Sequence, residues 1–137
     1  MIKLNRKTVL TIVYISMIGM LFTACGGKMN MNQEFMYEQI TQEEAKKIID
    51  EQDGYVIIDA RTHEEFATGH IPNAICIPNE TIDEGIGDQL PDKEQLLLIY
   101  CRSGNRSKQA ADKLVKLGYT NIKEFGGIIT WPYDIVK

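Results

Sequence analysis

The amino-acid sequence predicts an α/β fold built on a parallel sheet. Two short apolar runs, at residues 55–58 and 96–100, have polar residues on both sides. Such runs are typical of strands that a parallel sheet buries on both faces. After the second run, apolar residues recur at helical spacing through Ala110 and Leu114, and Gly118 stands where a glycine commonly ends a helix. Strand and helix therefore alternate along the chain, which is the pattern of an α/β domain.

The first half of the chain begins with a short strand, expected at residues 35–40. Thr41 and Glu44 follow with the spacing of a capping box, in which each side chain bonds to the backbone N–H of the other residue. This motif predicts that a helix begins after Thr41, and Asp53 with Gly54 predicts its end.

The remaining elements are read from shorter signals. Residues 74–78 predict a short strand, and the polar segment 79–92 predicts a short helix and a loop. We expect the last strand at residues 119–125, a tight turn at residues 126–127, and a short helix or irregular cap over residues 128–136.

A cysteine ends the apolar run 96–100 and precedes a polar turn and the start of a helix. Ligands bind at this edge of open α/β sheets. Backbone N–H groups of a curled loop and of a helix N-terminus form an anion site, and a thiol directed into such a site is stabilised as the thiolate. The candidate site consists of Cys101 as the nucleophile and of Arg102, Ser103, Gly104, Asn105 and Arg106 as substrate-binding groups.

Three blocks of the sequence match a family pattern in order. The first is Asp-x-Arg, then Glu with an aromatic residue, then Gly-His-Ile-Pro; the second is Cys-x-x-Gly-x-Arg-Ser; the third is a glycine pair and a tryptophan. The matching residues are Asp59, Arg61, Glu65, Phe66, Gly69, His70, Ile71, Pro72, Cys101, Gly104, Arg106, Ser107, Gly126, Gly127 and Trp131. From about residue 36 onward, the chain resembles the rhodanese family of sulfurtransferases.

The resemblance implies a single doubly wound domain, whose mostly parallel sheet of about five strands is flanked by helices. It also implies that Cys101 accepts a sulfane sulfur from a donor such as thiosulfate. The resulting persulfide would pass the sulfur to a thiophilic acceptor, such as a thiol or cyanide. No cofactor is implied, and the sequence has no Cys/His spacing typical of a zinc site.

Asp59 and Arg61 follow the first apolar run and are expected at the same sheet edge as the nucleophile. For Asp59, two roles remain open, positioning the edge of the site or tying down the next segment. Arg61 is expected to have the structural role, with Glu65 as a plausible partner. Neither His63 nor His70 is expected to be catalytic, since a loop of amides can ionise a thiol without a base.

Other functions are compatible with parts of the sequence. Cys76 lies in a short apolar strand and is interpreted as a core thiol, with a resolving cysteine for Cys101 as the alternative. In that case the domain could be an extracytoplasmic thiol–disulfide protein that uses Cys76 and Cys101. A separate alternative is an extracytoplasmic sulfur carrier or sensing module. A cysteine phosphatase or arsenate reductase ranks lower, because a tyrosine-phosphatase-type loop has five residues between Cys and Arg, whereas four separate Cys101 from Arg106.

The N-terminal part of the chain is predicted to be a secretory leader. Residues 1–24 have a basic start and then a mostly apolar run without charge. The small residues before Cys25 resemble the lipobox of bacterial lipoproteins, in which the cysteine carries lipid. Residues 25–34 would then form a tether, and residues 35–137 the domain. An uncleaved signal anchor is the alternative, and both interpretations place a membrane-anchored domain outside the cytoplasm.

The balance of charge excludes a broad class of partners. The whole chain carries a formal charge of −4, and the leader contributes only positive charge to it. The domain therefore has no general attraction for nucleic acid or anionic lipid.

The lipid hypothesis is testable with Cys25→Ser. If Cys25 carries the lipid, this variant leaves the membrane fraction of expressing cells for the soluble fraction, while wild-type protein stays with the membrane. Continued membrane association of the variant, with the leader still attached by mass, would instead support the signal anchor.

Overall fold

The computed structural model describes residues 36–137. The predictions made for the leader at residues 1–24, for Cys25 as a lipid site and for the tether at residues 25–34 lie outside these residues.

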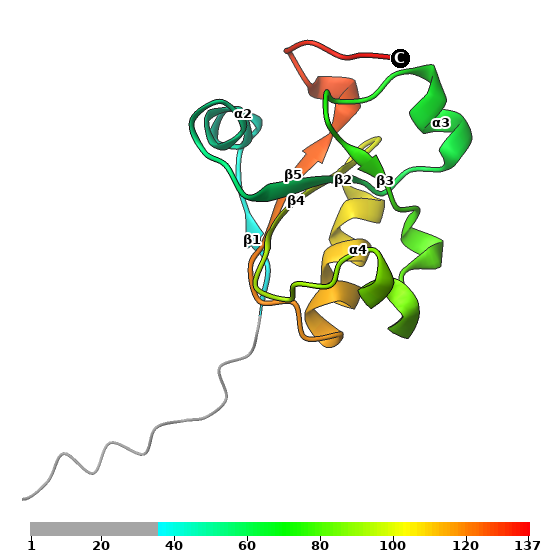
Figure 1. Cartoon of the computed structure of the whole chain (residues 1–137). Helices are drawn as coiled ribbons and strands as arrows, with labels where there is room; N and C mark the ends of the chain where they lie inside the picture. The colour runs from blue at the N-terminus through cyan, green and yellow to red at the C-terminus, as the bar shows by residue number, and fades with distance from the viewer. Residues whose placement is uncertain (1–35) are drawn as a thin grey trace, which may run out of the picture. The chain divides into compact units, whose positions relative to one another are not determined.

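Five strands form one parallel sheet in the order β1-β5-β4-β2-β3 (Figure 1). They are β1 (Glu38–Gln39), β2 (Tyr55–Asp59), β3 (Ile75–Cys76), β4 (Leu96–Cys101) and β5 (Ile122–Gly127). The predicted α/β class and the sheet of about five strands are therefore confirmed. Strand β4, which carries Cys101, lies at the centre of the sheet with a neighbour on each side.

Helix α2 (Gln42–Glu51) begins where the capping box predicts. The Thr41 hydroxyl accepts the Glu44 N–H at 3.1 Å, and the Glu44 carboxylate accepts the Thr41 N–H at 2.7 Å. A second capping box, of Thr62 and Glu65, starts the short helix α3 (His63–Thr68), which the sequence analysis did not anticipate. The Thr-x-x-Glu spacing was the signal that could have revealed it.

The longest described helix is α4 (Asn105–Lys116), which follows the Cys101 loop directly. Gly118 has a φ of +93° just beyond the C-cap residue Leu117, so its predicted role in ending the helix is confirmed. The polar segment 79–92 contains two 3₁₀ helices, η1 (Asn79–Thr81) and η2 (Glu84–Asp88), and a third, η3 (Ile128–Thr130), follows β5.

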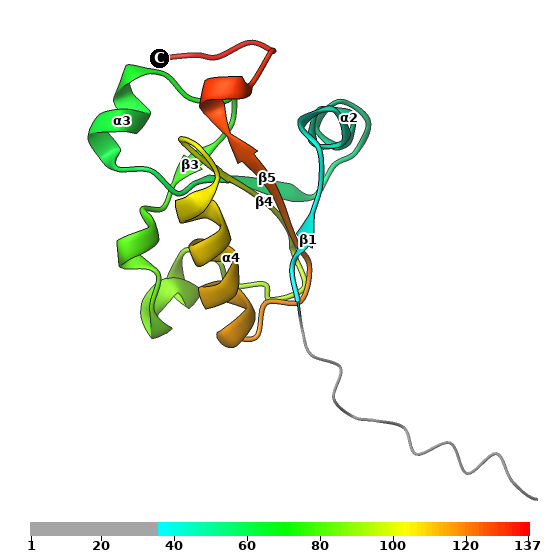
Figure 2. The same cartoon turned by 180° about the vertical axis from the view of Figure 1, so that it is seen from behind.

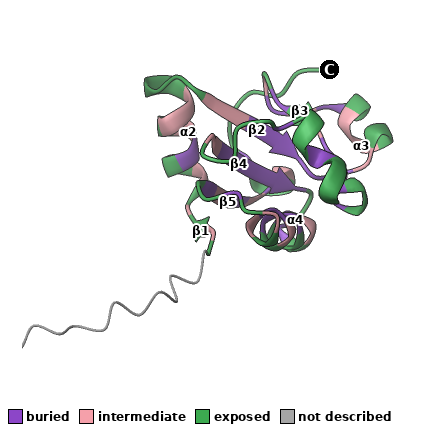
Figure 3. Cartoon of the chain, turned by 60° about the horizontal axis from the view of Figure 1, so that its bottom comes forward, coloured by how far each residue is buried: buried purple, intermediate pink, exposed green. Residues whose placement is uncertain are grey.

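Helices cover both faces of the sheet, with α2 and α4 on opposite sides (Figures 1 and 2). Side chains along β4 alternate between two cores, because successive residues of a strand point to opposite faces. Leu97, Ile99 and Cys101 join the core beneath α4, whereas Leu98 and Tyr100 join the core beneath α2. The central strands are accordingly buried, and the exposed residues lie mainly on the surrounding helices and loops (Figure 3).

The predicted tight turn at residues 126–127 is wrong, because both glycines belong to β5. Gly127 pairs with Cys101, and the register between β4 and β5 shifts between Ile99 and Cys101. The extra residue is accommodated at Gly126, whose φ of +89° suits glycine. The glycine pair thus extends the sheet beneath the Cys101 loop instead of reversing the chain.

Candidate active site

Cys101 is the last residue of β4 and is only 1% exposed. Its Sγ accepts a hydrogen bond from the Gly104 N–H, with an N–S distance of 3.0 Å. Gly104 is the N-cap residue of α4 and has a φ of +106°, a conformation that turns the loop back over the sulfur. The sulfur is therefore directed at the loop and the positive end of α4.

The residues of the loop differ in their exposure to solvent. Arg102, Ser103 and Asn105 are exposed, whereas Arg106 is half-buried. Arg106 is close enough to Cys101 for negative charge on the sulfur to contribute to the raised pKa of this guanidinium. An anion that approaches the loop from solvent would meet positive charge and polar side chains first.

The larger cause of the raised pKa of Arg106 is its hydrogen bonding to Glu65. Two guanidinium nitrogens donate to the two carboxylate oxygens at 2.6 and 2.8 Å. In return, the Arg106 bond lowers the pKa of Glu65 from 4.5 to about 2. The expected pairing of Glu65 with Arg61 is therefore wrong: Glu65 joins the start of α3 to the start of α4.

Arg61 pairs with Asp59 instead, in a buried bidentate contact. Its Nη2 lies 2.7 Å from Asp59 Oδ2 and 2.7 Å from the Gly69 carbonyl oxygen, to which it also donates. Burial lowers the pKa of Arg61, but the hydrogen bonds and charge of Asp59 more than offset this and raise it. Asp59 pairs with Tyr100, whose side chain lies on the α2 face, so these groups and Cys101 lie on opposite faces of the sheet.

The same face holds the segment around Gly69 and His70. Tyr100 accepts the Ile71 N–H on its hydroxyl at 3.1 Å, and burial, followed by Asp59, raises the pKa of Tyr100 well above its usual value. His70 stacks on Phe66 with ring centroids 3.7 Å apart and exchanges two backbone hydrogen bonds with Val136. In the described part of the chain, Asp59, Arg61 and His70 thus make contacts that secure loops.

Gly127 permits the Cys101 loop to pack directly onto β5. A Cβ atom at this position would lie 2.1 Å from the Arg102 carbonyl oxygen and 2.6 Å from Ser103 Cα. The same carbonyl accepts the Ile129 N–H at 3.3 Å. Only glycine fits between the loop and the strand, so the end of β5 fixes the height of the loop above the sheet.

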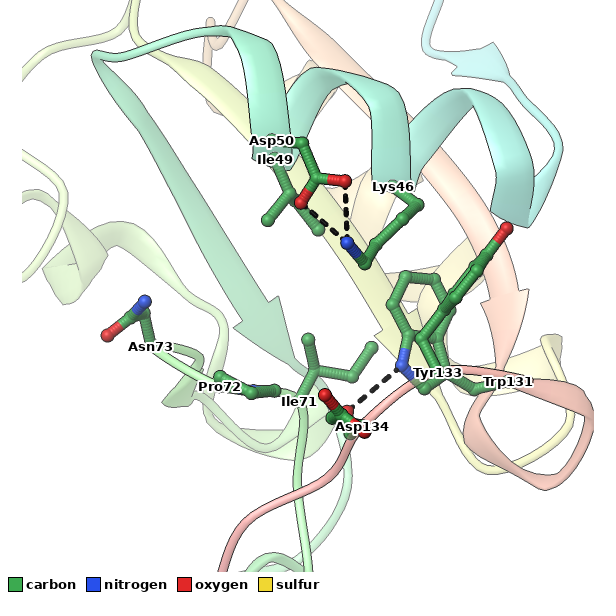
Figure 4. Close-up of a pocket in the computed structure, with 9 residues that line it drawn as sticks. All are labelled: Lys46, Ile49, Asp50, Ile71, Pro72, Asn73, Trp131, Tyr133 and Asp134. Carbon is green, nitrogen blue, oxygen red and sulfur yellow. Dashed lines mark hydrogen bonds and ion pairs between the residues drawn. The ribbon is translucent and has the colours of Figure 1, made fainter.

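The described residues form two cavities of interest. One, of about 320 Å³, is lined by residues of the Cys101 loop, α4 and β5, among them Ser103, Gly104, Lys108 and Glu124. The other, of about 170 Å³, lies between α2, residues 71–73 and the C-terminal segment (Figure 4). Lys46 in its lining is paired with Asp50 at 2.5 Å, and no residue of the Cys101 loop lines this cavity.

Cys76 lies two strands away from Cys101. It pairs with Asp59 of β2, the strand that lies between β3 and β4. Two strand spacings separate its Cα from β4 by roughly 10 Å, which is too far for a disulfide without backbone movement. Burial, and then Asp59, raise the pKa of the Cys76 thiol to about 11. Its Sγ lies 3.5 Å from the Arg61 carbonyl oxygen. These observations favour an unreactive thiol over a resolving cysteine.

Two residues of the site escaped the sequence analysis. Ser107 was part of the matched motif but was given no role, and Glu124 was not considered. Ser107 Oγ lies 3.4 Å from Cys101 Sγ and 2.6 Å from Glu124 Oε1. No local signal distinguishes Glu124, because a glutamate next to Lys123 in a strand resembles a solvent-facing residue.

Within residues 36–137, no group of three or more His, Cys, Asp or Glu side chains is placed to hold a metal ion. None of the helices in this range is both long enough and apolar enough to cross a membrane.

Comparison with known families decides the assignment of the fold. Residues 41–131 match the model of the rhodanese-like domain. The chain belongs to the rhodanese-like family. The match includes both the Cys101 loop and the segment that holds Asp59 and Arg61, so it covers the whole of the site.

Individual relatives agree with this assignment. The chain is 37% identical over 71 residues to the thiosulfate sulfurtransferase PspE of Escherichia coli, an alignment that covers 52% of this chain and 68% of PspE. It is 31% identical over 104 residues to the adenylyltransferase and sulfurtransferase UBA4 of Candida albicans, covering 71% of this chain but 24% of UBA4. Among solved structures, a rhodanese with anions from E. coli superimposes with a TM-score of 0.56 at 34% identity, covering 61% of this chain and 98% of that one. The names of these relatives support a sulfurtransferase activity in general terms.

Gly127→Ala tests the contact between the loop and β5. The added methyl group overlaps the Arg102 carbonyl, so we expect the free energy of unfolding in urea to fall by about 1–3 kcal/mol. Gly87→Ala is the matched control, because a Cβ at Gly87 meets no atom within 4 Å. Equal stabilities of the two variants would contradict the close contact.

Glu65→Gln tests the ion pair with Arg106 through its pH dependence. Because folding lowers the pKa of Glu65 from 4.5 to about 2, the stabilisation by the ionised carboxylate is complete above about pH 4.5 and is lost as the pH falls through about 2. At pH 6, the free energy of unfolding in urea should therefore be about 1 kcal/mol higher for wild type than for the variant. This difference should be smaller at pH 2.5. Glu94→Gln, which changes an exposed carboxylate, is the control; a difference that does not vary with pH would count against the pair.

Proposed function

We propose that this protein is a sulfurtransferase that carries a sulfane sulfur as a persulfide on Cys101. The observation that supports this most directly is the 3.0 Å hydrogen bond from the Gly104 N–H to Cys101 Sγ, at the N-terminus of α4. A group that both attacks and leaves must be a stable anion, and this environment stabilises a thiolate.

In the first step, the Cys101 thiolate attacks the outer sulfur of a donor such as thiosulfate. A new S–S bond forms, the donor's own S–S bond breaks, and sulfite departs with the electron pair. The persulfide that remains is an anion, so the groups that stabilise the thiolate also suit its terminal sulfur. The positive charges of Arg102 and Arg106 favour the approach of an anionic donor.

In the second step, a thiophilic acceptor such as a thiol or cyanide attacks the terminal sulfur. The Cys101 S–S bond breaks, and its electron pair returns to Cys101 as the thiolate. No redox cofactor is consumed, because the acceptor takes the sulfur in the same oxidation state in which the donor supplied it.

Thiol–disulfide exchange between Cys76 and Cys101 is less well supported. The two residues lie on β3 and β4 with β2 between them, and the pKa of Cys76 is raised to about 11. A thiol of this kind is largely protonated at neutral pH and attacks a persulfide or disulfide slowly.

We also propose, from the sequence, that Cys25 carries lipid and holds the domain at the outer side of a membrane. Its sulfur donor and acceptor would then be extracytoplasmic compounds.

Cys101→Ser should abolish sulfur loading. After incubation with thiosulfate and removal of excess donor, intact mass spectrometry of wild-type protein should show the gain of one sulfur atom, which peptide mapping assigns to Cys101. Cys76→Ser is the matched control and should load like wild type. Loading of Cys101→Ser, or of Cys76 in wild type, would refute the assignment, and a Cys76–Cys101 disulfide would support redox exchange.

A further inference from the structure

Glu124 is a buried carboxylate that the mechanism above does not use. It is 3% exposed, and its neighbour across the sheet is Ile99, on the α4 face that also holds Cys101. Among the ion pairs of residues 36–137, none involves Glu124. A buried carboxylate needs hydrogen-bond partners, and its oxygens can accept a proton from a donor that is bonded to them.

The partners of Glu124 lead directly to the nucleophile. Its Oε1 accepts the Gly126 N–H at 2.8 Å and lies 2.6 Å from Ser107 Oγ. This oxygen–oxygen distance is in the range of a charge-assisted bond, and it is the shortest contact of the Ser107 hydroxyl, which also lies 2.9 Å from the Gly104 carbonyl oxygen. Since a hydroxyl has one proton, the proton that goes to Glu124 leaves a lone pair of Ser107 for the Cys101 S–H at 3.4 Å.

We propose that Ser107 and Glu124 form a proton relay that generates the Cys101 thiolate. The Cys101 S–H bond breaks as its proton forms a bond to Ser107 Oγ, and the original Ser107 proton moves to Glu124 Oε1. The products are a thiolate, a serine hydroxyl that now donates to this thiolate, and a neutral carboxyl group. The net charge of the site does not change, and no co-reactant is needed. Ser107 touches the reacting sulfur, whereas Glu124 is a positioning residue that acts through Ser107.

Charged groups from several elements lie around the relay. At the start of α4, Arg106 is paired with Glu65, and the charges of Cys101 and Glu80 also act on it. Lys108, also on α4, lines the cavity to which Glu124 contributes.

Two further charges complete the surroundings. Arg102 is exposed on the loop, and on the sheet Lys123 is paired with Glu38 of β1. Of these cations, Arg106 adds its charge near Cys101, whereas Glu124 is in none of the ion pairs of residues 36–137 and depends on the Ser107 hydroxyl and the Gly126 N–H as partners.

The test is the pH dependence of Cys101 alkylation by iodoacetamide. Full-length protein is reacted for short times from pH 4 to pH 10, and peptide mapping separates Cys101 from Cys25 and Cys76. Groups that share a proton titrate in two macroscopic steps, so the wild-type rate should rise, reach a plateau and rise again. Glu124→Gln and Ser107→Ala should each give a single step and react about tenfold slower at pH 7, and the double variant should be no slower than either. Glu38→Gln, which removes an exposed carboxylate near the same strand, should behave as wild type.

Two results would overturn the relay. One is a single step in the wild type. The other is a Glu124→Gln or Ser107→Ala protein that reacts at pH 7 as fast as wild type or faster, as the loss of a nearby negative charge alone would cause. If thermal unfolding shows that Glu124→Gln is not folded, Ser107→Ala decides the matter by itself.

The relay rests on the sulfurtransferase function proposed above, but the two can fail separately. Alkylation requires no sulfur donor, so a wild-type protein that shows the two steps and yet takes no sulfur from thiosulfate would refute the function and retain the relay. A protein that loads sulfur with a single-step profile would do the reverse.

Discussion

The arrangement of the site depends on how closely the Cys101 loop lies on the end of β5. The Arg102 carbonyl occupies the space that a side chain would fill at Gly127, and it is bonded there by the Ile129 N–H. This contact fixes the loop so that the Gly104 N–H reaches Cys101 Sγ. The chemistry of the thiol is therefore a consequence of backbone packing between a loop and a strand that are well separated in the sequence.

The two faces of the sheet differ in role: the α4 face carries the reactive side chains, and the α2 face carries the groups that hold a neighbouring loop. On the α4 face, Cys101, Ser107 and Glu124 form a short series of polar contacts within an otherwise apolar core. On the α2 face, Asp59 and Arg61 form a buried pair that holds the segment near Gly69. Adjacent strand residues point to opposite faces, so Asp59, which pairs with Tyr100, is on the other face from Cys101. The Asp59 carboxylate thus lies near the reactive edge but on the far side of the sheet from the sulfur.

Periodicity and capping signals predicted much of the fold. The apolar runs located β2 and β4, and Thr41 with Glu44 located the start of α2, since these signals are local. Pairings between distant residues were harder to predict. Glu65 is four residues from Arg61 in sequence, and proximity favoured that pair, yet the tertiary structure gives Glu65 to Arg106. Likewise, the glycine pair was interpreted as a turn, because sequence does not reveal that a loop lies against one of its members.

The placement of Cys101 at the loop was predictable, because a nucleophile at the end of a buried strand is encoded in consecutive residues. Glu124 was not, because its burial depends on α4 covering that part of β5. A charged residue in a strand is ordinarily assigned to the solvent face, and only the three-dimensional structure shows that a serine on α4 is its partner.

The close fit at Gly127 also limits how this domain could change its substrate. A Cys101 loop that is one residue longer would form a wider ring of backbone N–H groups, which would suit a larger anion. The Arg102 carbonyl, which now packs against Gly127, would then have to move away from β5. The length of the Cys101 loop and the residues at the end of β5 must therefore change together. To bind larger oxyanions, the domain would need changes in both the loop and β5. An insertion in the loop alone would bring its backbone into collision with the strand at Gly127.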